Sequence, residues 1–294
     1  MYSLKKKKRQ RGDRHMKKSK GKKIEHWTPL GIFGLFCTIL ITVIAVFPFI
    51  YMFLMSFTES RTLKLHLNEV DFTNLENFAY IFKNSGFLQA FINSVVVVIA
   101  SCALNVVISC MAAYGFEKKL FPGRKFIFQI YMISLMIPGQ VTMIPLFVIM
   151  KNVGLLNTRT ALVITMIGAF SVFLVKQFMN GIPDELIESA QVDGCPEYRI
   201  FIQIVMPLLK PVVITLIVFT FISAWNDFLW PLIAATETEK YTLTVALSVL
   251  KTQYSVNYGL IMSVSLVTFI FPFILYIFLQ KQFVQGIALG GVKG

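Results

Sequence analysis

Residues 87–116 read "FLQAFINSVVVVIASCALNVVISCMAAYGF" and contain no Asp, Glu, Lys, Arg or His. A helix of about 20 apolar residues is long enough to cross the hydrocarbon core of a bilayer. Lipid offers no partner for backbone polar groups, so only helices and closed barrels span it. Because this stretch is continuously apolar and does not alternate with a period of two, it predicts a membrane-spanning helix.

The rest of the chain repeats this pattern. Its 294 residues are 56% hydrophobic and only 15% charged, with 28 Phe, a composition suited to a bilayer. The first apolar run is too long for the core of a signal peptide and lacks a small-residue cleavage site, so we keep it as a helix. We therefore expect an all-α membrane protein with six transmembrane helices, at residues 30–57, 87–116, 126–150, 160–175, 211–232 and 254–279.

The positive charge is concentrated in a basic tail, residues 1–29, which precedes a membrane domain of residues 30–294. The tail holds 12 Lys or Arg against Asp13 and Glu25, whereas the whole chain has a net charge of +13. With six spans, 21 Lys and Arg fall on the side of the amino terminus and 7 on the other, which predicts that both termini are cytoplasmic. The tail has no interleaved aromatic residues and no known module, so we expect no nucleic-acid partner.

The expected spans contain almost no ionisable side chain; the single exception is Asp227, near the outer end of the fifth. An ion-coupled carrier normally needs a titratable relay at mid-depth, and none is visible. There is no candidate general base or metal-ligand cluster, and no G-x-x-x-x-G-K-[ST] phosphate loop. We therefore expect a chain that is not an enzyme, binds no metal or cofactor itself, and depends on other subunits for energy.

Neutral polar groups are what the spans offer to a solute. Amides can meet hydroxyl groups and aromatic rings can stack on sugar rings, which favours a pathway for a neutral, hydroxyl-rich ligand. Two alternatives stay open: an Asn in a membrane helix often bonds a neighbouring helix, and an interfacial Trp often belongs to the aromatic belt. The candidate pathway residues are Asn93, Gln140, Trp225, Asn226 and Asp227.

Between the fourth and fifth spans, residues 183–207 predict a short helix, a glycine turn and a second helix on the cytoplasmic side. Pro183 suits the first helical position, acids follow in the first turn, and Gly194 suits the residue just past a helix end. The first helix carries four acids and no basic residue, the wrong sign for an anionic membrane surface. This favours a protein partner with a basic groove, with Leu186, Ile187 and Ala190 supplying the apolar adhesion.

Here the sequence resembles a known family. "ESAQVDG", followed by "IVMP", resembles the EAA loop of bacterial ATP-binding-cassette importer permeases, which docks into a groove of a cytoplasmic ATPase subunit. Ser189 and Met206 replace the usual Ala and Leu of the pattern. The resemblance implies that ATPase coupling is carried by Leu186, Ile187, Glu188, Ser189, Ala190, Asp193, Gly194 and Pro207.

Other motifs extend the resemblance from about residue 30 to the carboxyl end. "MIPGQVTMIPLF" from Met136, "VGLLNT" from Val153, "WNDFLWPL" from Trp225 and the final "GGVKG" are similar to the sugar-importer branch, of the maltose-transporter MalG type. The resemblance implies one of two different permease subunits, the other MalF-like. Two ABC ATPase subunits would carry ATP and Mg, and an extracellular sugar-binding protein would deliver the ligand.

The expected function is therefore that of a permease subunit in a bacterial cytoplasmic membrane, forming half of the pathway for a sugar or oligosaccharide. A permease for another small solute and an ATP-independent secondary carrier are the alternatives. The lack of intramembrane carboxylates disfavours a cationic solute, and the lack of basic residues there disfavours an anion.

Two more contact regions follow from the resemblance and from position. The glycine-rich end, which we expect not to form a helix, would reach the ATPase subunits through Gly290, Gly291, Val292, Lys293 and Gly294. The outer loop that follows the fifth span would contact the binding protein through Glu237, Glu239, Lys240 and Tyr241.

Overall fold

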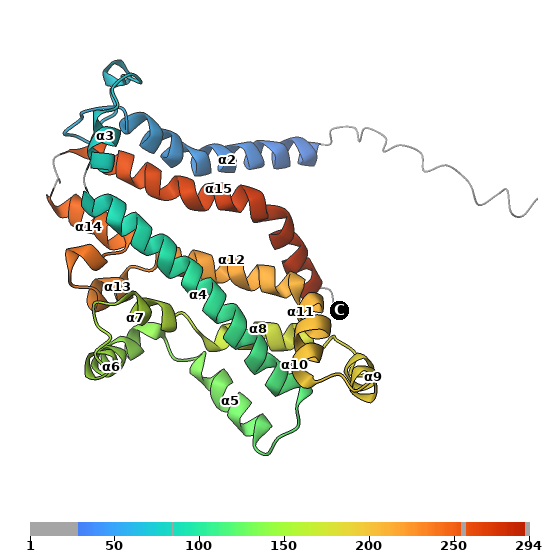
Figure 1. Ribbon diagram of the computed structural model, residues 1–294. Coiled ribbons are helices and arrows are strands. Elements are labelled where there is room, and N and C mark those ends of the chain that lie inside the picture. The colour runs from blue at the N-terminus through green and yellow to red at the C-terminus, as the bar shows by residue number, and fades with distance from the viewer. Residues whose placement is uncertain (1–28, 84, 254–256, 292–294) are drawn as a thin grey trace, which may run out of the picture. The chain divides into compact units, whose positions relative to one another are not determined.

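The computed structural model describes residues 29–83, 85–253 and 257–291, and this part of the chain is helical without a strand (Figure 1). The expected all-α architecture is confirmed. Residues 1–28 of the basic tail lie outside the described residues. The chain divides into two units, residues 1–50 and residues 51–294, which we describe separately.

The first unit contains most of helix α2 (Pro29–Met55), an apolar helix free of charged residues. Its threonines bond within the helix: the Thr38 and Thr42 hydroxyls each donate to a carbonyl oxygen four residues earlier, at 2.8 Å. Because these hydroxyls are satisfied internally, the helix presents only apolar surface to its surroundings. Its length and composition are those of a membrane span.

The second unit is built around α4 (Ser85–Lys118), which packs against α8 (Ala169–Met179) and α12 (Lys210–Asn226). Helix α12 packs in turn against α15 (Tyr258–Gly291), so α12 lies between α4 and α15 (Figure 1). Together with α2, the apolar parts of α4 and α15 are the three described helices long enough to cross a membrane unbroken. The second and sixth expected spans thus coincide with single helices.

The third, fourth and fifth expected spans are not continuous helices, which corrects the prediction. The third bends by 105° between α5 (Arg124–Ser134) and α6 (Gly139–Asn152), where Pro138 lacks the N–H that a continuing helix requires. The fourth divides into α7 (Arg159–Ile164) and α8, with an extended backbone at Gly168. The fifth, expected at residues 211–232, is interrupted after Asn226, where Asp227 has an extended backbone. Counting each bent helix pair as one span gives up to five spans among the described residues, so the number six stays a prediction.

Shorter elements connect these helices. The 3-10 helix η1 and helix α3 follow α2; α9, α10, the π-helix η2 and α11 precede α12; and α13, the 3-10 helix η3 and α14 lie between α12 and α15. Their bounds are Leu67–Glu69 for η1, Glu76–Lys83 for α3, Glu185–Val192 for α9, Glu197–Arg199 for α10, Ile200–Val205 for η2, Met206–Leu208 for α11, Leu229–Ala234 for α13, Thr238–Lys240 for η3 and Leu243–Gln253 for α14.

The backbone of α15 is helical as far as Gly291, which corrects the expectation of a non-helical glycine-rich end. The stretch continues an existing helix, so it carries no nucleation cost that would weigh against it. Ile287, Ala288 and Leu289 also separate its glycines and favour the helical backbone.

Helix α15 begins in very close contact with the loop that follows α2. The carbonyl oxygen of Thr58 lies where a Cβ atom on Gly259 would stand, so only glycine fits there. The Asn77 amide donates to the carbonyls of Ser56 at 3.1 Å and Thr58 at 2.9 Å, and the Ser263 hydroxyl donates to Ser56 at 2.9 Å. These bonds satisfy two carbonyls of the loop directly after α2 inside the protein.

Candidate functional site: the elbow and the outer loops

The segment at residues 183–207, which we call the elbow, contains the expected helix, glycine turn and second helix. Helix α9 ends at Val192, and Gly194 follows with φ of +75°, in the left-handed region. The Gly194 N–H donates to the Gln191 carbonyl and the Cys195 N–H to the Ala190 carbonyl, both at 3.0 Å. Glycine here lets the chain reverse while the last carbonyls of the helix stay bonded.

The second limb of the elbow leads into α12. It consists of α10, η2 and α11, and η2 is a six-residue π-helix. The axis from Glu197 to Leu208 then bends by 77° into α12, next to Pro207 and Pro211. A π-helix and a proline-flanked bend are both departures from the regular helical hydrogen-bond ladder.

The inner face of the elbow packs on its own chain. Ile187 and Ala190 are only 6% and 7% exposed, in one cluster with Cys110 and Tyr114 of α4. The expectation that both residues adhere to a partner is corrected, because their surfaces are already covered. They are three positions apart and share one helix face, whereas Leu186 lies at its edge and is exposed.

The outer face of the elbow is apolar at its centre and acidic around it. Val192, which the sequence interpretation missed, is 88% exposed. A helical plot would have found it, because Val192 stands five positions after Ile187, about 140° around the helix from that buried side chain. We define the outer elbow face as the exposed residues Glu185, Leu186, Glu188, Ser189, Val192 and Asp193.

Of the expected pathway residues, Asn93 joins α4 to other parts of the chain through hydrogen bonds. Its amide nitrogen donates to the carbonyls of Glu239 at 2.8 Å and Tyr241 at 2.9 Å. Its amide oxygen accepts from the Arg159 guanidinium at 2.8 and 3.0 Å and from Gln89 at 3.2 Å. The side chain is buried and its hydrogen-bonding capacity is in use, which matches the alternative in which a membrane Asn joins helices.

Trp225 is part of the core. Its ring stacks on Phe271 with centroids 4.7 Å apart and on Phe221 at 5.8 Å, and it meets Phe91 edge-on at 6.1 Å. The side chain is buried, so neither the pathway nor the aromatic-belt interpretation describes it.

The remaining pathway candidates are more accessible. Asn226 is exposed and donates to the Ile222 carbonyl at 2.9 Å, whereas Asp227, half-buried, ends α12 and accepts through its carbonyl from Thr244 at 2.6 Å. Gln140 is exposed as the second residue of α6.

The outer loop around η3 is held at two points. Asn93 binds it from α4, and Asn157, with φ of +58°, accepts from the Thr236 N–H at 2.6 Å and the Glu237 N–H at 3.3 Å. Glu237 and Glu239 are exposed, and Lys240 and Tyr241 are half-buried. The four expected contact residues are therefore presented on a braced loop.

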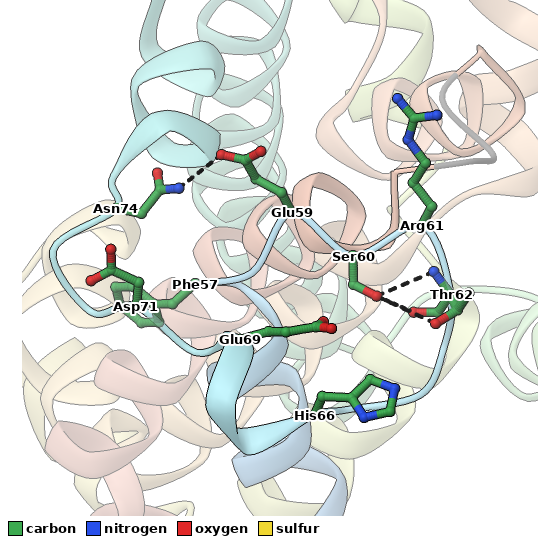
Figure 2. A pocket seen from close by; sticks show the side chains of 9 residues that line it. All are labelled: Phe57, Glu59, Ser60, Arg61, Thr62, His66, Glu69, Asp71 and Asn74. Carbon is green, nitrogen blue, oxygen red and sulfur yellow. Dashed lines mark hydrogen bonds between the residues drawn. The ribbon is translucent and has the colours of Figure 1, made fainter.

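The loop after α2 encloses a polar pocket of about 630 Å³ (Figure 2). The Asn74 amide donates to the Glu59 carboxylate at 2.9 Å, and the Ser60 hydroxyl donates to the Thr62 carbonyl at 2.9 Å. The Thr73 hydroxyl and N–H both donate to Asp71 and hold the pKa of that carboxyl below its usual range. No sequence motif marked this pocket, which is lined by Phe57, Glu59, Ser60, Arg61, Thr62, His66, Glu69, Asp71 and Asn74.

Residues 105–288 match the family described as binding-protein-dependent transport system inner membrane component. The chain is 37% identical over 260 residues to the arabinooligosaccharides transport system permease protein AraQ of Halalkalibacterium halodurans, covering 86% of this chain and 93% of that protein. It is 34% identical to the lactose transport system permease protein LacG of Rhizobium radiobacter, over 85% of this chain and 92% of that one.

A solved structure has the same fold. It belongs to a bacterial ABC transporter involved in the import of the acidic polysaccharide alginate, and one of its chains superposes with a TM-score of 0.76. The match covers 85% of this chain and 96% of that chain at 23% identity, so it supports the fold alone.

Proposed function

Because this chain belongs to the family of binding-protein-dependent transport system inner membrane components, we propose that it is a permease subunit of an ATP-driven importer for a sugar or oligosaccharide. The observation that carries the proposal is the similarity along most of the chain to permeases named for arabinooligosaccharides and for lactose. A second, different permease subunit of the MalF-like kind would form the other half of the pathway. The spans would cross the cytoplasmic membrane with both termini inside, as the distribution of Lys and Arg favours.

The outer elbow face is the proposed docking surface for a cytoplasmic ABC ATPase. Leu186 and Val192 supply exposed apolar area, and Glu185, Glu188 and Asp193 supply negative charge for a basic groove. Burial of the two apolar side chains gives the adhesion, whereas each rim ion pair adds only about 0–1 kcal/mol. ATP and Mg bind the two ATPase subunits, and this chain contributes the surface on which those subunits act.

The inner face of the elbow would then transmit movement of the ATPase subunits to α4. Ile187 and Ala190 pack against α4, so a displacement of α9 also displaces the helix around which this unit is built. Close-packed interiors transmit such shifts because they do not deform continuously.

Two further contacts belong to the proposal. The braced loop around η3 presents Glu237 and Glu239 to an extracellular sugar-binding protein. We also propose that the carboxyl end reaches the ATPase subunits; Gly290 and Gly291 end α15, and Val292, Lys293 and Gly294 lie outside the described residues.

Reconstitution tests the proposal. The chain is purified with its second permease subunit and its ATPase pair, placed in proteoliposomes, and supplied with the binding protein and a radiolabelled arabinooligosaccharide or lactose. We expect uptake only with ATP and all subunits, and photo-crosslinking from a label at Val192 to the ATPase. Uptake by the chain alone, or an ATPase crosslinked elsewhere while Val192 contacts only lipid, would overturn it.

A further inference from the structure

Three consecutive charged residues lie at the end of helix α4, and each is paired with a different part of the chain. Glu117 and Lys118 close the helix, and Lys119 follows it directly. The central one, Lys118, has its ammonium nitrogen 2.6 Å from the Asp184 carboxylate, just before α9. The same nitrogen donates to the Ile182 carbonyl at 2.6 Å. Lys118 therefore binds both the Asp184 side chain and the Ile182 backbone, in the segment that leads into α9.

Glu117 points to α8. Its carboxylate lies 2.6 Å from the Lys176 ammonium and accepts from the Asn180 amide at 2.7 Å. Both partners stand at the end of α8, immediately before the elbow. Glu117 thus joins α4 to the helix from which the elbow emerges.

Lys119 points to the second limb of the elbow. Its ammonium nitrogen is 2.5 Å from the Glu197 carboxylate at the start of α10, and the Tyr114 hydroxyl also donates to Glu197. The Lys119 ammonium lies over the Tyr114 ring as well, 5.2 Å from its centroid. Tyr114, near the end of α4, and Lys119, directly after it, therefore both bind the Glu197 carboxylate.

Glu117 and Lys118 are successive residues of a helix and diverge by about 100°, and Lys119 lies just past the helix end, so the three side chains reach in three directions. Here those directions are α8, the entry to α9 and the start of α10, which bracket the elbow on both sides of its glycine turn. Beneath them Ile187 and Ala190 pack on α4. We propose that Glu117, Lys118 and Lys119 form a positioning clamp that makes the elbow move with α4 as one body.

The burial of Lys118 and Glu117 separates these two residues from ordinary interfacial charges. A lysine that anchors a helix to lipid headgroups keeps its ammonium in water, whereas the Lys118 side chain is only 4% exposed. Glu117 is 15% exposed in its own pair, whereas Lys119 at 33% and the carboxylates of Glu197 at 50% and Asp184 at 72% are more accessible. The Lys118 and Glu117 charges need their partners, because a lone buried charge is strongly unfavourable.

The backbone route from the elbow makes such a clamp useful. The covalent path from α9 to α12 runs through the Gly194 turn, the π-helix η2 and a bend of 77°. A straight, regularly hydrogen-bonded helix is stiff, and each of these three features departs from it. The backbone path from α9 to α12 is therefore less rigid than a continuous helix. The side-chain contacts to α4 bypass all three, so force that reaches α9 enters the pathway through α4. This inference rests on the proposed function, because it assigns the route by which the elbow acts.

Charge exchange tests the clamp in the complete reconstituted importer. The variants are Lys118→Asp, Asp184→Lys and the double exchange, and Lys125→Met is the matched control. Lys125 is exposed in α5, shortly after the end of α4, and it forms no ion pair with any residue that the structure describes. The readout is sugar imported per ATP hydrolysed, which a change in the amount of folded complex does not alter.

We expect Lys118→Asp to lower import per ATP by about tenfold, within the range typical of coupling between two sites. The double exchange should restore it to within about threefold of wild type, and the control should match wild type. A wild-type complex that shows no ATP-driven uptake would overturn the proposed function. A working wild type with unchanged import per ATP in Lys118→Asp would overturn the clamp alone.

If the Lys118→Asp complex fails to assemble, a cross-link tests whether the elbow moves with α4. Cysteines placed at 118 and 184, in a background without the four native cysteines, are joined by a short bismaleimide. A clamp that moves as one body predicts that the joined complex still transports. Loss of transport on joining, with single-cysteine controls unaffected by the reagent, would show that the elbow slides against α4 and would overturn the inference.

Discussion

Replacing Gly259 with Ala tests the close approach of α15 to the loop that follows α2. The added Cβ atom would stand 1.8 Å from the Thr58 carbonyl oxygen and 2.9 Å from its carbon, whereas ordinary contacts begin at 3.4 Å. The two backbones must separate by roughly 1.6 Å, the difference between 3.4 and 1.8 Å. Overpacking of this kind costs about 1–3 kcal/mol, and loss of the Asn77 bond to Thr58 adds about 1 kcal/mol.

We therefore expect Gly259→Ala to destabilise the protein by about 2–4 kcal/mol. Thermal unfolding of the purified complex in detergent, followed by size-exclusion chromatography, measures the effect. Gly115→Ala is the matched control: Gly115 lies inside α4, and its added Cβ would meet nothing within 4 Å. That change should be neutral or stabilising by up to about 1 kcal/mol, since Ala favours a helix. Equal stability of Gly259→Ala and wild type would refute the reasoning.

Three further changes address the elbow and the outer loop. Gly194→Pro should abolish import while ATP hydrolysis continues, because proline cannot adopt φ of +75°; preserved import at wild-type expression would contradict this. Ala190→Leu should cost about 1–3 kcal/mol of packing free energy and lower import per ATP, since that side chain is enclosed by the cluster with α4; uptake and ATPase assays on one preparation measure it, and an unchanged ratio counts against it. Asn93→Leu leaves the Arg159 guanidinium without its acceptor and two carbonyls without a donor, at a cost of about 2–4 kcal/mol; faster proteolysis of the loop around η3 is the expected sign, and equal rates would show that Asn93 does not hold that loop.

The sequence predicted the long helices well because hydropathy reports the cost of placing each residue in lipid. It could not predict the bend between α5 and α6, since an apolar run looks the same whether it is straight or folded at Pro138. The break at Gly168 was hidden for the same reason. Composition therefore indicates which residues lie in lipid better than it indicates how many straight helices they form.

At the elbow, acids and glycine mark helix ends through local chemistry, so the helix and its turn could be read from single residues. Pro183 was wrongly expected at the first helical position, because α9 begins two residues later, at Glu185. The assignment of faces was less successful, because Leu186 and Ile187 are neighbours in the sequence but differ in burial. The clamp was missed because its lysines resemble ordinary positive-inside charges. Their partners Asp184 and Glu197 are far along the chain, and only the fold brings them together.

Helix α4 is fastened at both ends by polar contacts. Asn93, near its beginning, holds the carbonyls of the outer loop, and Lys118, at its end, holds the elbow. At 1.5 Å per residue the two points are about 37 Å apart along a single rod. Because both points lie on one continuous helix, a tilt imposed at one of them also tilts the other, without a relay of small rearrangements between them.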